Sequence, residues 1–335
     1  MNNVWPLPRI VFQDLASVQE TRPTALITEA TAWGRVDSML KLPVVVQAEP
    51  TRQDREFVEE LAHSLPSASE VIYVVGDGLL CDVGRFVSFA SRKPLVIVPT
   101  ALATDEPFVA TSTLTSGDRT AELPTGAANE VIIDFDVIRA ASPALRAAAI
   151  VDVLSIFTGL MDWTYAQDMG HEDGAKLLPW VAGVAAQIAG HALKIAPALG
   201  TGDSDALRDL VILLCLTVQI DNQLGHRRLS QGSEHIFANA LLLNDTVVDV
   251  SHAERVAAGI LLATTLHGKD VSGLRGAMEA AGVRVGQVKP NDVRETFLEL
   301  PEYARSTKAP YTLLNDLQNN SAQLIEALTR STLLD

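Results

Sequence analysis

Residues 71–90 read VIYVVGDGLLCDVGRFVSFA. Five apolar, mostly β-branched residues precede Gly76-Asp77-Gly78, and apolar residues at helical spacing follow, which predicts a strand, a tight turn and a helix. Two glycines let the backbone turn sharply and leave the first N–H groups of the helix free to face a phosphate. The same pattern is typical of an ordinary strand-to-helix turn, so a nucleotide site and a plain turn both stay open.

The chain on either side repeats this alternation of short strands and helices. Candidate helices are Thr51–Ser64 and Leu79–Ser91. The candidate strands are Arg9–Phe12, Thr24–Thr28, Val44–Gln47, Val71–Val75, Leu95–Val98 and Val131–Asp134. Strands that alternate with helices are typical of a parallel sheet. We therefore predict an α/β amino-terminal domain with a parallel, Rossmann-like sheet.

The strand-like runs stop near Ser142-Pro143, and the remainder has helical periodicity. The candidate helices are Val151–Gln167, Leu207–Gln219, Ile236–Leu243, Glu254–Leu266 and Ser321–Leu328. This predicts an α/β domain over residues 1–143 and an all-helical domain over residues 144–335. The apolar stretch Leu177–Leu199 contains Gln187, His191 and Lys194, so we expect a buried or amphipathic helix and no membrane span.

Charge indicates which partners are not expected, and cysteine content indicates where in the cell the protein is expected. The 335 residues include 26 basic and 41 acidic side chains, a formal net charge of −15, with no basic cluster. Nucleic acid and anionic membrane surfaces are therefore not expected as partners. Cys81 and Cys215 have no CxxC partner, and the first residues lack the pattern of a secretory signal, so we expect a cytoplasmic protein.

A second motif follows the next strand. Residues 98–105 read VPTALATD, and the carboxyl ends of neighbouring parallel strands share one edge of a sheet, where ligands bind. Thr100, Thr104 and Asp105 suit a ribose, a nicotinamide amide or a polyol. An ordinary helix N-cap explains the same residue types equally well.

Two histidines stand at the expected starts of helices. They lie in Gly232-Ser233-Glu234-His235 and in Ser251-His252, and Asp152 stands inside an otherwise apolar helix. A buried carboxylate needs a partner, and an aspartate with two histidines suits a divalent metal ion. Structural histidines remain the alternative at this point.

Together these segments resemble the metal-dependent polyol and alcohol dehydrogenase superfamily that includes dehydroquinate synthase, and within it the glycerol-1-phosphate dehydrogenase branch. GDGLLCDVGRF resembles the GGGxxxDxxK/R dinucleotide turn, and VPTALATD resembles the PTxxSxD loop. RLSQGSEH, residues 228–235, resembles SRPxSGSEH, and SHAERVAAG resembles HGExVAxG. The order of these motifs covers most of the chain and implies a dehydroquinate synthase-like fold with a dinucleotide-binding and a metal-binding domain.

The resemblance implies that Asp152, His235 and His252 bind one divalent metal ion, with Ser155 and Asp162-Trp163 also matching. His267, in LHGKD, competes with His252 for the third place. If one helix joins these two histidines, their 15-residue separation places them about 22 Å apart. The HGE-like context favours His252.

The resemblance also implies a dinucleotide site and a substrate site. Its cofactor-binding residues are Glu29, Gly76, Asp77, Gly78, Asp82, Thr100, Thr104, Val109 and Thr111. Glu29 is expected to accept hydrogen bonds from the adenosine ribose, which favours NAD over NADP. Asp105 is the expected catalytic residue and orients a substrate hydroxyl, while Arg228 and His267 are expected to bind substrate. A surface arginine is the alternative for Arg228.

These residues predict an NAD(P)-dependent oxidoreductase of a small polyol or polyol phosphate, with glycerol 1-phosphate and dihydroxyacetone phosphate as the first choice. Zinc is the first choice of metal, with iron, nickel and manganese as alternatives. Asp77, Val109 and Ile150-Val151 replace three glycines and a serine of the family pattern and favour, as an alternative, a non-catalytic ligand-binding protein. The second alternative is a dehydroquinate synthase-like cyclase. A homo-oligomer is left open.

Overall fold

The computed structural model describes residues 4–116, 119–171, 175–243, 247, 249–317, 326, 328–331 and 333. The chain divides into two compact units, residues 1–146 and 147–335. The division falls three residues after the position expected from sequence, because the short helix α5 (Pro143–Arg146) stays with the first unit. The carbonyl of Arg146 accepts a hydrogen bond from the backbone N–H of Leu102 at 3.2 Å.

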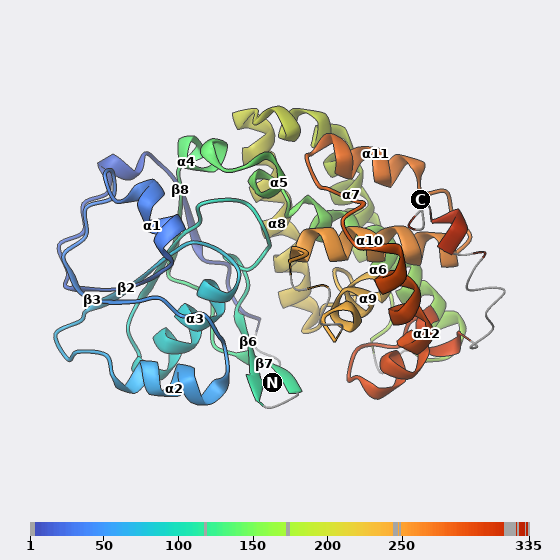
Figure 1. Cartoon of the computed structure of the whole chain (residues 1–335), viewed down its shortest axis with the longest axis horizontal. Helices are drawn as coiled ribbons and strands as arrows, with labels where there is room; N and C mark the ends of the chain where they lie inside the picture. Colours follow the sequence, from blue (N-terminus) through green and yellow to red (C-terminus); the bar gives the residue numbers. More distant parts are fainter. Residues whose placement is uncertain are drawn as a thin grey trace. The chain divides into compact units, whose positions relative to one another are not determined.

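The first unit is built on a six-stranded parallel sheet with the order β1-β8-β5-β4-β2-β3 (Figure 1). Its strands are β1 (Arg9–Phe12), β2 (Thr24–Thr28), β3 (Val44–Ala48), β4 (Val71–Val75), β5 (Leu95–Val98) and β8 (Glu130–Ile133). The predicted fold class is confirmed, and every predicted strand is present to within one residue at either end. Continuous apolar runs are what a parallel sheet buried on both faces requires.

Helices and one hairpin surround this sheet. They are η1 (Leu15–Ser17), α1 (Ala30–Val36), α2 (Arg55–His63), α3 (Leu79–Ser91), α4 (Phe135–Ala140), β6 (Thr111–Ser116) and β7 (Arg119–Pro124). Helix α2 begins four residues later than expected, because the Asp54 side chain caps it by accepting from the Phe57 N–H. The antiparallel hairpin β6–β7 was not predicted. Its first strand reads TSTLTS, in which only Leu114 gives an apolar signal.

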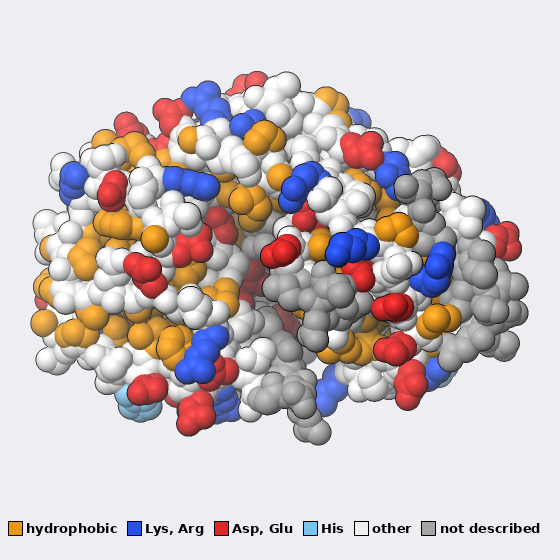
Figure 2. All heavy atoms as spheres, in the orientation of Figure 1, with side chains coloured by type: hydrophobic (Ala, Val, Ile, Leu, Met, Phe, Trp, Pro, Cys, Tyr) orange, Lys and Arg blue, Asp and Glu red, His pale blue; other side chains and the backbone are white. Residues whose placement is uncertain are grey.

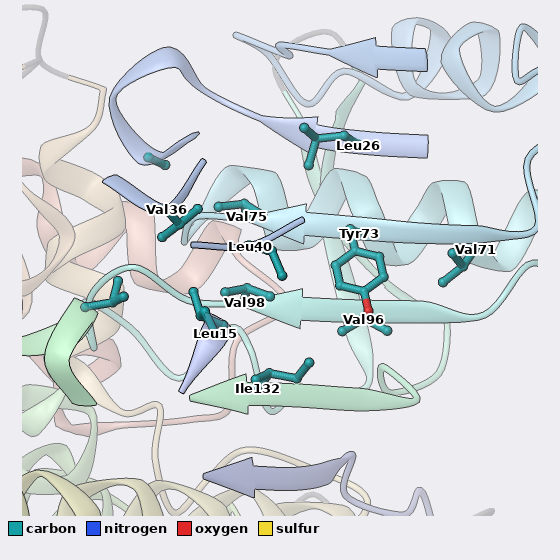
Figure 3. Packing of buried hydrophobic residues seen from close by; sticks show 12 residues of the cluster. Leu15, Leu26, Val36, Leu40, Val71, Tyr73, Val75, Val96, Val98 and Ile132 are labelled. Carbon is teal, nitrogen blue, oxygen red and sulfur yellow. The ribbon is translucent and has the colours of Figure 1, made fainter. Parts of the chain in front are cut away.

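The core of the first unit lies against one face of the sheet (Figure 3). Leu26, Tyr73, Val75, Val98 and Ile132 project from the strands toward side chains of the covering segments, which include Leu15, Ala32, Val36, Leu40 and Val137. On the opposite face, α3 packs closely on β4. A Cβ at Gly84 would lie 2.1 Å from Cγ2 of Val74, so only glycine permits this approach.

The second unit is helical. Its elements are α6 (Ile150–Asp168), α7 (Pro179–Thr201), α8 (Ser204–Leu224), α9 (Ser233–Leu241), α10 (His252–Leu266), α11 (Ser272–Ala280), α12 (Pro290–Ser306) and η3 (Leu313–Asp316). Helix α10 packs against both α6 and α9 (Figure 1). The stretch Leu177–Leu199 forms most of α7, and no helix among the described residues is long and apolar enough to cross a membrane. Most of the expected helix Ser321–Leu328 lies outside the described residues.

Acidic and basic side chains are interspersed on the face of the molecule shown in Figure 2, without a continuous basic area on that face. Both cysteines are free thiols, with Cys81 buried and Cys215 partly exposed.

Candidate metal centre and dinucleotide turn

Three helices of the second unit begin at one point. Asp152 is the third residue of α6, His235 is the third residue of α9, and His252 is the first residue of α10. One donor atom from each side chain lies within 4.8 Å of the other two. Oδ1 of Asp152 is 3.1 Å from Nε2 of His252 and 3.7 Å from Nε2 of His235. The structure therefore brings together the three residues expected as metal ligands.

Local sequence fixes where α10 begins. Ser251 and Glu254 form a capping box in which the Ser251 hydroxyl accepts from the Glu254 N–H and the Glu254 carboxylate accepts from the Ser251 N–H. Glu254 also pairs with Arg284 at 2.6 Å. These contacts hold His252 at the first helical position.

The start of α9 is fixed by an acid on α6. The carboxylate of Asp162 accepts from the backbone N–H of Ser233 at 2.7 Å and from its hydroxyl at 2.9 Å. His235 follows two residues later, so Asp162 anchors the turn that carries this ligand. The same carboxylate accepts from Nε2 of His267 at 2.9 Å.

Glu234 is a functional residue that the sequence analysis did not assign. Its side chain is fully buried, and its Oε1 accepts from the Gly232 N–H at 2.6 Å and from Nδ1 of His235 at 2.8 Å. Its Oε2 accepts from the Thr158 hydroxyl at 2.6 Å. Because Nδ1 is used in this way, Nε2 of His235 is the nitrogen left for a metal ion.

The electrostatics of the cluster favour a cation. Burial by itself raises the pKa of Asp152, but His252 and His235 outweigh burial and hold this pKa well below its ordinary value. Burial lowers the pKa of His235, but Asp152 and Glu234 outweigh burial and raise it to about 9. Two buried carboxylates thus hold positive charge at this point. The His252 side chain is 36% exposed, against 6% for Asp152 and 10% for His235, so the cluster is reached from the side of His252.

The structure does not bring His267 to this cluster. It is the C-cap residue of α10, whereas His252 is the first residue of the same helix. Its Nε2 holds Asp162, and its ring lies edge-on to Tyr165. His267 therefore supports the Asp162 anchor, a role different from the expected contact with substrate.

Arg228 lies in the segment between α8 and α9 that leads to His235. Only 5% of the residue is exposed, so the alternative of a surface arginine is wrong. Gly159 on α6 allows this segment to approach, because a Cβ there would lie 2.3 Å from the carbonyl oxygen of Leu229 and 3.0 Å from that of Arg228.

In the first unit, the glycine turn joins β4 to α3 as expected. Gly76 has φ of +133° and Gly78 has φ of +55°, values that favour glycine. Gly78 is the N-cap of α3 and provides no side chain to cap it. The N–H groups of the first turn are therefore not satisfied by a capping side chain.

Two acids lie at this turn. Glu29 is the exposed N-cap residue of α1, directly after β2, and β2 pairs with β4 so that Thr28 lies opposite Val75. Asp77 follows the end of β4. Its Oδ2 accepts from the Ala101 N–H at 3.1 Å and from the Thr100 hydroxyl at 3.5 Å, so its side chain turns toward the loop after β5.

Asp82 has structural contacts that the sequence analysis did not predict. Its Oδ1 accepts from the Thr113 N–H at 2.8 Å and from the guanidinium of Arg85, also at 2.8 Å. Arg85 is buried and donates further to the carbonyl of Thr111 at 2.7 Å and to the carbonyl and carboxylate of Glu106. Arg85 thus holds the loop after β5 against α3. Asp82 and Arg85 are three residues apart on one helix, and this spacing is the sequence signal that could have indicated their ion pair.

The remaining residues expected at the dinucleotide site, and the expected catalytic residue Asp105, lie in the loop after β5 or in β6. Asp105 is 7% exposed, Val109 is buried, and Thr100 contacts Asp77. The Thr104 hydroxyl accepts from the Glu106 N–H at 3.3 Å. Thr111 stands at the start of β6, where its hydroxyl donates to Glu122 at 2.9 Å.

Comparison with known proteins agrees with this arrangement. Residues 17–143 match the sequence model of the family described as iron-containing alcohol dehydrogenase. Over 285 residues, 83% of this chain and 78% of the relative, the sequence is 28% identical to a glycerol-1-phosphate dehydrogenase (NAD(P)+) of Aeropyrum pernix. The chain is therefore similar to the iron-containing alcohol dehydrogenase family over residues 17–143, and to a glycerol-1-phosphate dehydrogenase over most of its length.

Solved structures share the fold of this chain. A probable glycerol dehydrogenase from Sinorhizobium meliloti superposes with a TM-score of 0.70 at 14% identity, covering 98% of this chain and 97% of that chain. A 2-epi-5-epi-valiolone synthase from Streptomyces hygroscopicus subsp. jinggangensis, with NAD+ and Zn2+ bound, gives 0.66 at 15% identity, with coverage of 97% and 96%. Since a dehydrogenase and a synthase share it, the fold alone does not select the reaction.

Proposed function

We propose that this protein is a metal-dependent NAD(P) dehydrogenase of a small polyol phosphate, with glycerol 1-phosphate and dihydroxyacetone phosphate as its substrate pair. The observation that carries the proposal is the Asp152, His235 and His252 cluster, in a chain similar over most of its length to a glycerol-1-phosphate dehydrogenase. NAD is the preferred dinucleotide and zinc the first choice of metal. A cytoplasmic location belongs to the same proposal and is supported by the two free thiols.

The donor set fits a divalent metal ion. One carboxylate and two imidazoles suit zinc, iron, nickel or manganese, and three protein ligands leave a coordination position for substrate, as in catalytic sites. The buried carboxylate of Glu234 orients His235, as such partners do for metal-binding histidines. When bound, the ion supplies Lewis-acid polarisation of the substrate oxygen.

Each of the remaining residues has a separate task in this proposal. Gly76 and Gly78 allow the turn that presents backbone N–H groups of α3 to the pyrophosphate. Glu29 accepts from the adenosine ribose, and Asp105 orients a substrate hydroxyl. Arg228 binds the substrate phosphate through paired N–H donors.

The test is the reduction of dihydroxyacetone phosphate by NADH with protein reconstituted with zinc. We expect NADH consumption that depends on the metal, and a much lower rate with dihydroxyacetone, which lacks the phosphate. The metal content of wild type should be about one ion per chain, and His235→Ala should lose both metal and activity. Equal metal content in wild type and His235→Ala would contradict the ligand assignment.

The non-catalytic alternative is favoured by Asp77 and Val109, which stand where the family pattern has a glycine and a serine. Fluorescence titration with NADH separates it from the dehydrogenase before any substrate is tried. The cyclase alternative is disfavoured, because the chain reads DEPFVATST after the loop aspartate where that branch has lysines and a DSSxGGK segment.

A further inference from the structure

Asp77 is the residue between the two turn glycines. A side chain at this position can face either a bound pyrophosphate or solvent. Instead its Oδ2 accepts hydrogen bonds from Ala101 and Thr100, in the loop that follows the neighbouring strand. The carboxyl group therefore connects the end of β4 to the end of β5, at the edge of the sheet where the turn lies.

The second carboxyl oxygen of Asp77 has no such partner. Its Oδ1 is buried and, among the residues that the structure describes, receives no hydrogen bond. An ionised carboxylate with one undonated, enclosed oxygen is costly, and protonation of that oxygen removes the charge. Burial is accordingly the main cause that raises the pKa of Asp77 to about 7.

The charged surroundings add to this effect. From the end of β2, Glu29 acts on Asp77 with like charge. From α3, the ionisable neighbour is the thiol of Cys81, whose own pKa burial raises well above its ordinary value, so that it stays neutral. The loop after β5 offers the backbone amides of Thr100 and Ala101 and the hydroxyl of Thr100, which lower the pKa by less than burial raises it. Within the described part of the chain, no basic side chain pairs with Asp77.

A bound dinucleotide would bring more negative charge to the same turn. This step rests on the proposed function, in which the uncapped start of α3, a 13-residue helix, receives the pyrophosphate. Asp77 stands immediately before Gly78, the N-cap residue of that helix. Phosphate charges near an enclosed carboxyl favour its neutral form, because like charges raise the pKa of an acid.

We propose that Asp77 enters the dinucleotide complex as the neutral acid, so that cofactor binding takes up one proton at this turn. The proton comes from solvent and forms an O–H bond at the unpartnered Oδ1, while Oδ2 keeps its bonds to the loop. No other bond forms or breaks. The proton is then a co-ligand of the dinucleotide, and a glycine at this position would not require it.

The experiment is calorimetric titration of the full-length, metal-loaded protein with NADH at pH 7, in buffers with different ionisation enthalpies. The dependence of the binding enthalpy on the buffer gives the number of protons exchanged. For wild type we expect uptake of roughly half a proton per NADH, and a Kd that rises up to about tenfold between pH 6 and pH 8. Asp77→Asn, the isosteric neutral variant, should show no uptake and a Kd that is constant over this range.

Glu29→Gln tests whether the neighbouring acid is the source of the effect. It should weaken NADH binding, because Glu29 is assigned to the ribose, but it leaves Asp77, so proton uptake should persist. Infrared difference spectra of NADH binding give a direct readout, because a carbonyl band of a protonated carboxyl group should increase in wild type and be absent in Asp77→Asn. Asp77→Gly should behave like Asp77→Asn and provides a second neutral variant if the first does not fold.

The outcomes separate the two proposals. NADH binding with no proton uptake, or with uptake that Asp77→Asn and Asp77→Gly leave unchanged, overturns the role of Asp77 and leaves the dehydrogenase proposal intact. No NADH binding by wild type or by either neutral variant overturns the dehydrogenase proposal, and the role of Asp77 with it.

Discussion

Glu234 accepts a hydrogen bond from Nδ1 of His235 at 2.8 Å, and Nε2 of the same ring faces the carboxylate of Asp152 at 3.7 Å. The orientation of one metal ligand is therefore set by the residue immediately before it in sequence. Glu234 is itself held on its other oxygen by Thr158 of α6. His235 and Glu234 thus lie on α9, and the residue that holds Glu234 lies on the packed helix α6.

This pairing predicts the effect of Glu234→Gln. Glutamine keeps an oxygen for Gly232 and His235 but loses the negative charge, so His235 becomes a weaker and less firmly oriented ligand. We expect metal affinity to fall by about 10- to 100-fold, the usual cost of losing such a partner, while the fold is kept. Zinc titration against a competing chelator measures the affinity, and circular dichroism checks the fold. Unchanged affinity would show that Glu234 supports only the turn.

The close contact between α9 and α10 predicts the effect of Gly259→Ala. A Cβ at Gly259 would lie 2.3 Å from the carbonyl oxygen of Glu234 and 2.8 Å from its carbonyl carbon, and backbone atoms cannot move aside cheaply. We expect a loss of about 1–3 kcal/mol in unfolding free energy and a lower metal content, because Glu234 must shift.

Gly183→Ala on α7 is the matched control for that variant. A Cβ at Gly183 meets nothing within 4 Å, and alanine favours a helix over glycine by about 1 kcal/mol. Urea unfolding of both variants measures the difference. Equal stability of the two would contradict the close-contact explanation.

Whether a structural feature can be predicted from the sequence depends on how far along the chain its interacting residues lie. The parallel strands were predicted closely because their apolar runs and the turns between them are local signals. Hairpin β6–β7 was missed, because its threonines and serines resemble a loop and its burial depends on distant contacts. The ligands Asp152, His235 and His252 came from motif resemblance. The partner of Glu234 on α6 is 76 residues away in sequence, and no local pattern reports it.

Asp77 shows the same limit at the dinucleotide turn. Its position between two glycines was evident, but its direction was not, because the groups that hold it lie after the next strand. The structural contacts of Asp82 were missed for a related reason. Its partner Arg85 is close in sequence. Arg85 also donates to the carbonyl of Thr111, which is 26 residues away, and no local pattern indicates that contact.

The substrate assignment of Arg228 predicts a selective kinetic effect. Lysine keeps the charge but loses the paired donors that match a phosphate, so Arg228→Lys should raise the KM for dihydroxyacetone phosphate by about tenfold or more. The slow reduction of dihydroxyacetone, which has no phosphate, should change little. Steady-state kinetics with both substrates measure the two effects. An equal loss with both substrates would indicate a structural role for Arg228.

The pKa of Asp77 predicts how stability depends on pH. Burial raises this pKa from 3.8 to about 7, so between these values the folded state holds a proton that the unfolded state has released. Stability therefore decreases as pH rises from about 4 through 7 and stays lower above. Asp77→Asn removes this contribution, so its stability relative to wild type should be greater at pH 8 than at pH 5 by about 2 kcal/mol or more. Urea unfolding at both pH values tests this, and an equal difference at pH 5 and pH 8 would contradict it.

The position of Glu29 predicts which dinucleotide binds better. Glu29 is exposed at the end of β2, next to the glycine turn that ends β4, where a carboxylate accepts from the ribose hydroxyls and repels a 2′-phosphate. NAD should therefore bind more tightly than NADP, and Glu29→Ser should narrow the gap mainly by improving NADP. The alternative is a solvated acid at a helix start, which would affect neither dinucleotide selectively. Binding isotherms for NAD and NADP on both proteins decide between these two roles of Glu29. All of them are measured at one ionic strength, because phosphate contacts depend on salt. A ratio of NAD to NADP affinity that is unchanged in Glu29→Ser would remove Glu29 from the dinucleotide site.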